Sequence, residues 1–234
     1  MERIYTIPVN EKFEKTAEHP EDGCPICRLF EDLEENELDL ILGASMMEPD
    51  IRIKTNEQGF CGTHFDMMLT RKNRLGLCLM LESHLDSVKK MMSDLPGSSL
   101  VGATGIMPMK RVHELNDSCY ICSRIEHHLK NMIETVVLLW DTEDQFKRKF
   151  AAQPYFCLPH YSRLLDYARR RLSKKNFAAF YREAYGINSR YLETLGGDVS
   201  WFCKKFDYRY QDEPWNNSKD AAERAVKFLT GIQR

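Results

Sequence analysis

Apolar residues recur along most of this chain at the spacing of amphipathic helices, and the alternation typical of β-strands is scarce. The pattern predicts helices over residues 25–43, 64–94, 120–140, 142–152, 159–172 and 176–195, and a last helix that ends at Gly231. Gly196-Gly197 is expected to stop the sixth helix, and Ser218 to cap the last one. Residues 3–9 are expected to be extended, and residues 46–53 irregular. The predicted fold class is therefore all-α, with an extended N-terminal segment.

Two kinds of short motif with metal-binding residues each occur twice. Cys24-Pro-Ile-Cys27 is followed by Cys61-Gly-Thr-His64, and Cys119-Tyr-Ile-Cys122 is followed by Cys157-Leu-Pro-His160. Matching positions in the two copies are 95 or 96 residues apart. This order predicts two Cys₃His sets. In each, the chain leaves a Cys-x-x-Cys pair, makes a helical excursion and returns to the same ion with the next Cys-x-x-His.

The residue types and their spacing favour Zn²⁺, two ions per chain. Zinc prefers four sulfur and nitrogen ligands in a tetrahedron. Residues three apart at the start of a helix share one face, and the unsatisfied N–H groups of a helix N-terminus favour thiolate over thiol. Each ion is therefore expected to tie the N-termini of two helices together.

Other uses of these cysteines remain open at this point. An iron–sulfur cluster held by three cysteines and one histidine is the alternative cofactor, although such clusters usually have more compact spacings. Disulfides would require an oxidising compartment, and nothing in the sequence marks the chain as secreted. A thioredoxin-like redox pair normally follows a strand in a βαβ unit, which the pattern does not show.

The motifs divide the chain into two internally duplicated helical repeats. Residues 1–95 form the first metal-binding repeat, residues 96–110 a flexible linker rich in glycine and proline, and residues 111–234 the second repeat with an aromatic and basic tail. We expect the two repeats to pack as one body.

Composition fits a soluble globular protein, with 43% hydrophobic and 29% charged residues. No run of about 18 apolar residues predicts a membrane-spanning helix. The first ten residues are too polar for a signal peptide. Cysteines grouped as ligands suit a reducing cytoplasm.

Charge is distributed unevenly along the chain. The net charge is −2, with 13 basic and 21 acidic residues in 1–117 but 20 basic and 14 acidic residues in 118–234. Either the halves attract each other, or the basic half faces an acidic partner or nucleic acid. The residues expected to form a nucleic-acid or partner surface are Arg169, Arg170, Arg171, Lys174, Lys175 and Arg209. The simpler alternative is a solvated helix face, beside a tail whose aromatic rings pack on the helical body.

Three features together resemble an uncharacterised bacterial family that is catalogued as a domain of unknown function. They are the start Ile4-Tyr-Thr-Ile-Pro-Val-Asn10-Glu11, the tandem metal motifs, and the tail Lys205-Phe-Asp207-Tyr208-Arg209-Tyr210 with Glu213-Pro214-Trp215. Some members of that family carry a transporter-related name. The resemblance covers nearly the whole chain and implies a small bacterial cytoplasmic protein, with no catalytic residues to transfer.

The sequence favours a scaffold or interaction module for a protein partner over an enzyme. Four protein ligands close the coordination shell of zinc and leave no position for substrate. Gly-rich phosphate loops, nucleophile elbows and His-Glu-x-x-His motifs are missing from the sequence. The alternatives are nucleic-acid binding through the second half, or a redox or metal sensor in which thiolate oxidation releases zinc.

Overall fold

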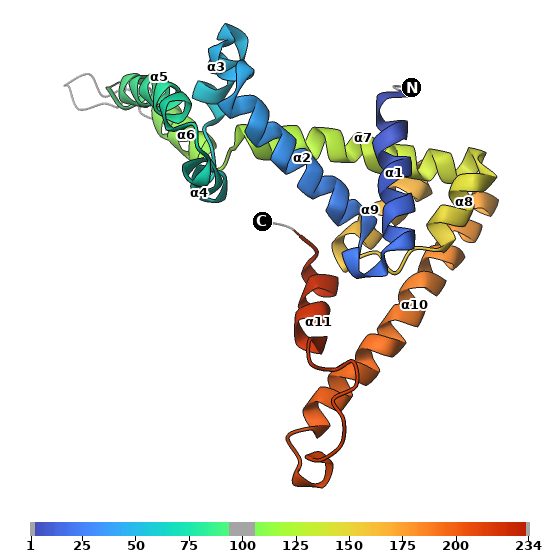
Figure 1. The fold of residues 1–234 in the computed structure, drawn as a ribbon. Helices are drawn as coiled ribbons and strands as arrows, with labels where there is room; N and C mark the ends of the chain where they lie inside the picture. The colour runs from blue at the N-terminus through green and yellow to red at the C-terminus, as the bar shows by residue number, and fades with distance from the viewer. Residues whose placement is uncertain (1–2, 94–105, 233–234) are drawn as a thin grey trace. The chain divides into compact units, whose positions relative to one another are not determined.

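The computed structural model describes residues 3–93 and 106–232, and within these ranges every regular element is helical (Figure 1). This confirms the all-α fold class. The α-helices are α1 (Thr6–Glu18), α2 (Pro25–Leu42), α3 (Pro49–Gln58), α4 (Gly62–Thr70), α5 (Arg74–Ser93), α6 (Ile106–Asn116), α7 (Tyr120–Thr142), α8 (Asp144–Ala151), α9 (Leu158–Arg171), α10 (Lys174–Lys204) and α11 (Ala221–Thr230). Four short 3₁₀-helices accompany them: η1 (Arg3–Tyr5), η2 (Pro20–Asp22), η3 (Ala44–Met47) and η4 (Tyr208–Tyr210). In the described residues, no helix is long and apolar enough to span a membrane.

The chain forms two compact units. The first unit consists of Met1–Glu31 and Leu129–Arg234, and the second of Asp32–His128. Both boundaries fall inside helices, one within α2 and the other within α7. Of the linker expected at residues 96–110, the part up to residue 105 lies outside the described residues, and the rest begins α6.

A cluster of phenylalanines forms the core of the first unit. Its members come from α1, α8, α10 and the segment before α9, and they are Phe13, Phe146, Phe150, Phe156 and Phe180. Their rings pack with centroids 4.8–6.3 Å apart. The long helix α10 contacts α9 and α11, and α11 returns along it after the tail (Figure 1). In the second unit, α5 packs against α3, α4 and α6.

The N-terminal segment is helical, so the predicted extended conformation of residues 3–9 is wrong. Residues 3–5 form η1, and α1 starts at Thr6. Pro8 falls in the first turn of α1, where a missing N–H breaks no helical hydrogen bond. Val9, Phe13 and Thr16 are buried at helical spacing, and burial of this stripe outweighs the local preference of the segment.

Several predicted helix boundaries also change. The helix expected over 64–94 is two helices, because the Asn73 side chain accepts a hydrogen bond from the Gly76 N–H at 2.9 Å and starts α5. Helix α10 continues through Gly196-Gly197 to Lys204. The N-cap of α11 is Asp220 and not Ser218. The segment expected to be irregular at 46–53 contains the start of α3, with Pro49 in its first turn.

Candidate metal centres

The eight predicted ligand residues form two separate Cys₃His groups. The buried centre consists of Cys24, Cys27, Cys157 and His160, and the open centre of Cys61, His64, Cys119 and Cys122. Within each group, all four ligand atoms lie within 4.8 Å of one another. The buried centre belongs entirely to the first unit and the open centre entirely to the second.

The structure exchanges the pairing that the order of the motifs predicted. Each Cys-x-x-Cys meets the Cys-x-x-His of the other repeat, so Cys27 joins Cys157 and not Cys61. A helix rises 1.5 Å per residue, so the 15 residues of α2 that follow Cys27 carry the chain about 22 Å away from it. The 20 residues of α7 that follow Cys122, and then α8, likewise separate Cys122 from Cys157. The helical excursions therefore lead to the other centre instead of returning to the first.

Each centre joins the N-termini of two helices, as the sequence predicted. Cys61 is the N-cap of α4 and Cys157 the N-cap of α9, while Cys24 and Cys119 immediately precede α2 and α7. The second ligand of each motif follows three residues later, in the first helical turn. Helix dipoles and free N–H groups at these ends stabilise negative charge on sulfur.

The ligand atoms of the buried centre have the spacing of a single tetrahedral ion. Cys27 Sγ and Cys157 Sγ are 3.5 Å apart. His160 Nδ1 lies 3.1, 3.4 and 3.8 Å from the sulfurs of Cys157, Cys27 and Cys24. Zn–S bonds of 2.3 Å and Zn–N bonds of 2.0–2.1 Å give tetrahedral edges of roughly 3.5–3.8 Å. All four residues are at most 3% exposed.

The open centre has the same spacing but a different environment. His64 Nδ1 lies 3.2–3.4 Å from all three sulfurs, and Cys61 Sγ is 3.9 Å from Cys122 Sγ. His64 and Cys119 are buried, whereas solvent reaches Cys61 and Cys122. All eight cysteines of the chain are free thiols, so the disulfide alternative does not apply to this structure.

Two further segments, α10 and the backbone after α11, contact the residues of the buried centre. The Asn188 side chain of α10 accepts from the N–H of Phe156 and donates to its C=O, both at 2.9 Å, which fixes the residue before Cys157. The backbone that follows α11 also lies against the centre. Gly231 has φ of +65°, and a Cβ built there would lie 2.9 Å from Cys157 Sγ, so this close approach requires glycine.

The acid–base properties of both groups favour a bound cation. Burial raises the pKa of the Cys24 thiol to about 12 and, with a smaller contribution from Arg163, lowers the pKa of His160 to about 4. In the open centre, the hydrogen bond with Cys122 lowers the pKa of the Cys119 thiol, and the same contact raises the pKa of Cys122. Three thiolates this close repel one another, whereas a divalent ion stabilises all three and accepts the neutral imidazole.

A buried carboxylate lies against the open centre, and the sequence analysis missed it. Glu34 on α2 is 3% exposed, and its Oε1 lies 3.4 Å from His64 Nε2. A histidine that binds metal through Nδ1 carries its proton on Nε2, and a carboxylate there fixes the ring and increases its basicity. The signal was readable, because Glu34 and Glu37 interrupt the buried stripe of Leu33, Leu38 and Ile41 on α2.

Replacing Glu34 with glutamine is expected to weaken metal binding at the open centre by about 10- to 100-fold, since the carboxylate no longer holds His64. Competition with a chromogenic chelator measures this affinity. Glu35→Gln is the matched control, because Glu35 lies next to Glu34 on α2 but is exposed and pairs with Arg71. Equal chelator competition in the two variants would show that Glu34 does not support the ligand.

The predicted basic surface is placed as follows. Arg169, Arg170 and Arg171 are exposed in the last turn of α9, and Lys174 and Lys175 are exposed at the start of α10. Arg171 pairs with Glu134 at 3.0 Å. Arg209, in the tail, pairs with Asp207 at 2.6 Å.

The tail that contains Arg209 lies at the opposite end of α10 from Lys174 and Lys175 (Figure 1), so the structure does not bring Arg209 together with the other basic residues, and the tail is held mainly by its own contacts. Lys205 is buried and donates to the carbonyl groups of Tyr210, Gln211 and Glu213 at 2.5–2.8 Å. The rings of Phe206 and Tyr208 are exposed. The tail therefore combines a fixed turn with two exposed aromatic side chains.

Comparison with known proteins gives a family but no activity. No curated protein and no solved structure matches this chain. One family matches over residues 1–234, which is the whole sequence. This chain, with its two Cys₃His groups at helix N-termini, thus belongs to the family of unknown function DUF6062.

Proposed function

We propose that the protein is a helical scaffold stapled by two structural zinc ions, and that it presents its surface to a protein partner in a reducing cytoplasm. The observation that carries the proposal is the completeness of both ligand sets. Each centre supplies four protein ligands within 4.8 Å, which closes the tetrahedral shell that structural zinc sites use. Catalytic zinc sites keep one position open for water or substrate.

The close spacing of the ligand atoms supports one ion per centre over an iron–sulfur cluster. The ligands of a cluster bind several different irons, so their sulfur atoms lie further apart than those around one ion. Thiolate and imidazole are ligands that suit zinc among the common divalent metals.

A structural role also agrees with the helix N-termini that each ion would join, because they are far apart in the sequence. In the buried centre, Cys24 and His160 are 136 residues apart in sequence, and the ion brings the starts of α2 and α9 together. Fixing such distant segments limits the conformations of the unfolded chain and adds the metal-binding free energy to folding. Nucleic-acid binding through Arg169, Arg170 and Arg171 is the alternative use of the surface.

Elemental analysis of protein purified without added metal tests the proposal, together with its visible spectrum. We expect about two zinc ions per chain and no colour, and Co²⁺ substitution should give the intense visible bands of tetrahedral thiolate-bound cobalt. Iron with a brown chromophore would replace the zinc proposal with electron transfer. Fewer than two ions, with full secondary structure, would show that one centre is not a structural staple.

A second function, zinc release in response to oxidants, is supported by the exposure of Cys122 and the partial exposure of Cys61. Accessible thiolates are the ones that peroxides oxidise, and oxidation of a ligand expels the ion.

A further inference from the structure

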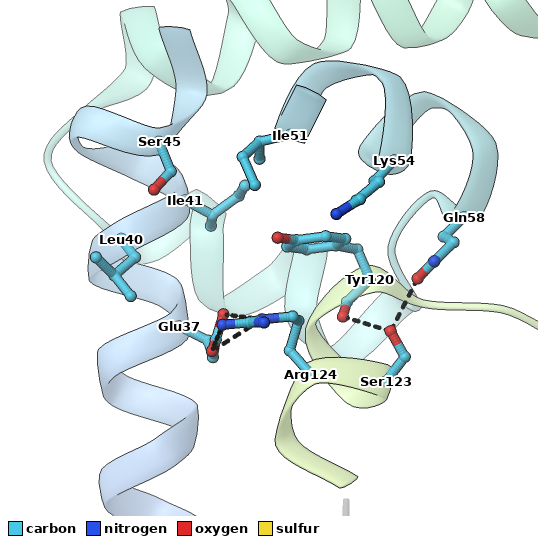
Figure 2. Close-up of a pocket in the computed structure, with 10 residues that line it drawn as sticks. All are labelled: Glu37, Leu40, Ile41, Ser45, Ile51, Lys54, Gln58, Tyr120, Ser123 and Arg124. Atoms are coloured by element: carbon cyan, nitrogen blue, oxygen red, sulfur yellow. Dashed lines mark hydrogen bonds and ion pairs between the residues drawn. The ribbon is translucent and has the colours of Figure 1, made fainter. Parts of the chain in front are cut away.

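The second unit contains a pocket (Figure 2), and one of its lining residues, Tyr120, lies between Cys119 and Cys122 of the open centre in the sequence. Its walls come from α2, η3, α3 and the first turns of α7, and its volume is about 330 Å³. Small-molecule sites in proteins have volumes of roughly 300–1,000 Å³, so this one suits a compact metabolite.

The pocket has an apolar side and an aromatic surface. Figure 2 shows the ring of Tyr120 across its middle, with Ile41 and Ile51 at one edge of the ring and Leu40 beyond them. Tyr120 is buried, and its backbone N–H donates to the Gly59 C=O at 3.0 Å. The ring therefore has a fixed position on which a flat or short aliphatic group can pack.

The charges around the pocket leave one cation without a counter-ion. Glu37 is buried and accepts from Arg124, with a shortest distance of 3.1 Å, and its Oε1 lies 3.6 Å from His128 Nε2. Its charge is thus already compensated. Within the described part of the chain, Lys54 makes no ion pair, and its ammonium group lies on the same side of the pocket as the Tyr120 ring (Figure 2).

We propose that this pocket binds a small organic monocarboxylate with an aromatic or short aliphatic body. The carboxylate pairs with the Lys54 ammonium group, and the body packs on the Tyr120 ring and against Ile41 and Ile51. The ion pair of Glu37 with Arg124 forms the base of the pocket. Because Arg124 compensates the charge of Glu37, this residue repels the carboxylate of the ligand less than an unpaired carboxylate would. A charge-assisted hydrogen bond to the ligand supplies orientation, and the apolar contacts supply affinity.

The pocket shares a helical turn with the open centre, since Tyr120 lies between the ligands Cys119 and Cys122. A bound ion would hold this turn in place, so the pocket rests on the proposed structural role of the metal to that extent. Binding of metal and of carboxylate should then favour each other. Zinc content must therefore be measured in every sample that is used for ligand binding.

The test uses the full chain, with ¹³C-labelled isoleucine δ1-methyl groups observed by NMR, and phenylacetate as the probe. A ligand of roughly ten non-hydrogen atoms that fills its pocket reaches a Kd of about 1 mM or tighter. We expect saturable shifts at Ile41 and Ile51, assigned through Ile51→Val and Ile41→Leu. Phenylacetamide, which has the same shape without the charge, should bind at least about tenfold more weakly.

The Lys54→Gln variant should also weaken phenylacetate binding by about tenfold or more, because the ion pair is lost. Lys89→Gln removes the same charge from an exposed position of α5 in the same unit and should leave the affinity unchanged. The proposal is overturned by equal binding of acid and amide, by unchanged affinity in Lys54→Gln, or by shifts that do not saturate. A zinc content other than two per chain would count against the structural ions, and the Lys54 comparison would still decide the ligand site.

Discussion

Replacing Cys157 with serine is expected to remove one zinc ion per chain and to unfold the first unit while the second stays folded. Cys157 is fully buried, and its sulfur lies 3.5 Å from that of Cys27 and 3.1 Å from Nδ1 of His160. A serine hydroxyl at this position is a poor zinc ligand, so the three remaining ligands are left buried without their ion. Structural zinc contributes about 10–16 kcal/mol in small zinc-dependent folds, whereas whole domains are stable by only about 5–15 kcal/mol.

Tryptophan fluorescence measures this effect in one unit alone. The three tryptophans, Trp140, Trp201 and Trp215, all belong to the first unit. Trp140 is buried, and its indole N–H donates to Glu183 at 2.7 Å. We expect red-shifted emission in Cys157→Ser, and a fall of at least about 5 kcal/mol in the free energy of unfolding of this unit.

Cys203→Ser is the matched control for Cys157→Ser. Cys203 lies in the same unit, is exposed and belongs to neither centre. This variant should keep two zinc ions and native emission. If Cys157→Ser keeps native emission and a cooperative transition after losing its ion, the buried centre does not hold the first unit together.

The sequence predicted the local parts of this structure because they depend on neighbours along the chain. The apolar stripe of α2 and the ligand spacing of Cys24 and Cys27 are both readable within one or two helical turns. The same holds for the end of α11 at Gly231, whose φ of +65° matches the preference of glycine for this position. All eight residues of the two Cys₃His groups could be named for this reason.

The sequence could not predict which Cys-x-x-Cys motif meets which Cys-x-x-His motif, because this depends on where the long helices α2 and α7 end in space. The two Cys-x-x-His motifs offer the same ligand atoms in the same spacing, so chemistry does not distinguish Cys61 from Cys157 as a partner of Cys27. Only the path of the chain in three dimensions decides which of the two cysteines meets Cys27. The origin of the two repeats by duplication stays a prediction. It is compatible with the observed pairing, in which each Cys-x-x-Cys meets the Cys-x-x-His of the other repeat.

The supporting contacts were missed for a related reason. Glu34 is recognisable in the sequence as an acid within an apolar stripe, but His64, which it supports, is 30 residues away and reached through α3. Gly231 likewise lies against Cys157, although the two residues are far apart in the sequence. Contacts between segments so far apart have no periodic signature.

The two ions are expected to leave the protein in a fixed order, the ion of the open centre first. Solvent reaches Cys61 and Cys122, whereas all four ligands of the buried centre are at most 3% exposed. The chain end adds to this protection, because Gly231 lies against Cys157 and the backbone of Ile232 hydrogen-bonds to Cys27. Release from the buried centre therefore requires local opening of the first unit, and each 1.4 kcal/mol of opening slows it about tenfold.

Oxidation of the cysteine ligands by hydrogen peroxide tests this order of release. Peroxide removes two electrons from two thiolates and takes up two protons, which yields one disulfide and two water molecules while the zinc ion departs. Cys61 Sγ and Cys122 Sγ are 3.9 Å apart, so a modest side-chain movement brings them to the S–S bond length of about 2.05 Å. The double variant Cys78→Ser/Cys203→Ser removes the two exposed thiols outside the centres and limits peroxide consumption to the ligands.

Zinc release, followed with a chromogenic chelator and recorded together with tryptophan fluorescence, assigns the phases. We expect one equivalent of zinc to appear at least about tenfold faster than the second. The fast phase should leave the emission unchanged, since the second unit contains no tryptophan, and the slow phase should shift it. Simultaneous release of both ions, or an emission change with the first, would mean that exposure of Cys61 and Cys122 does not govern lability, and would remove the support for an oxidant-responsive centre.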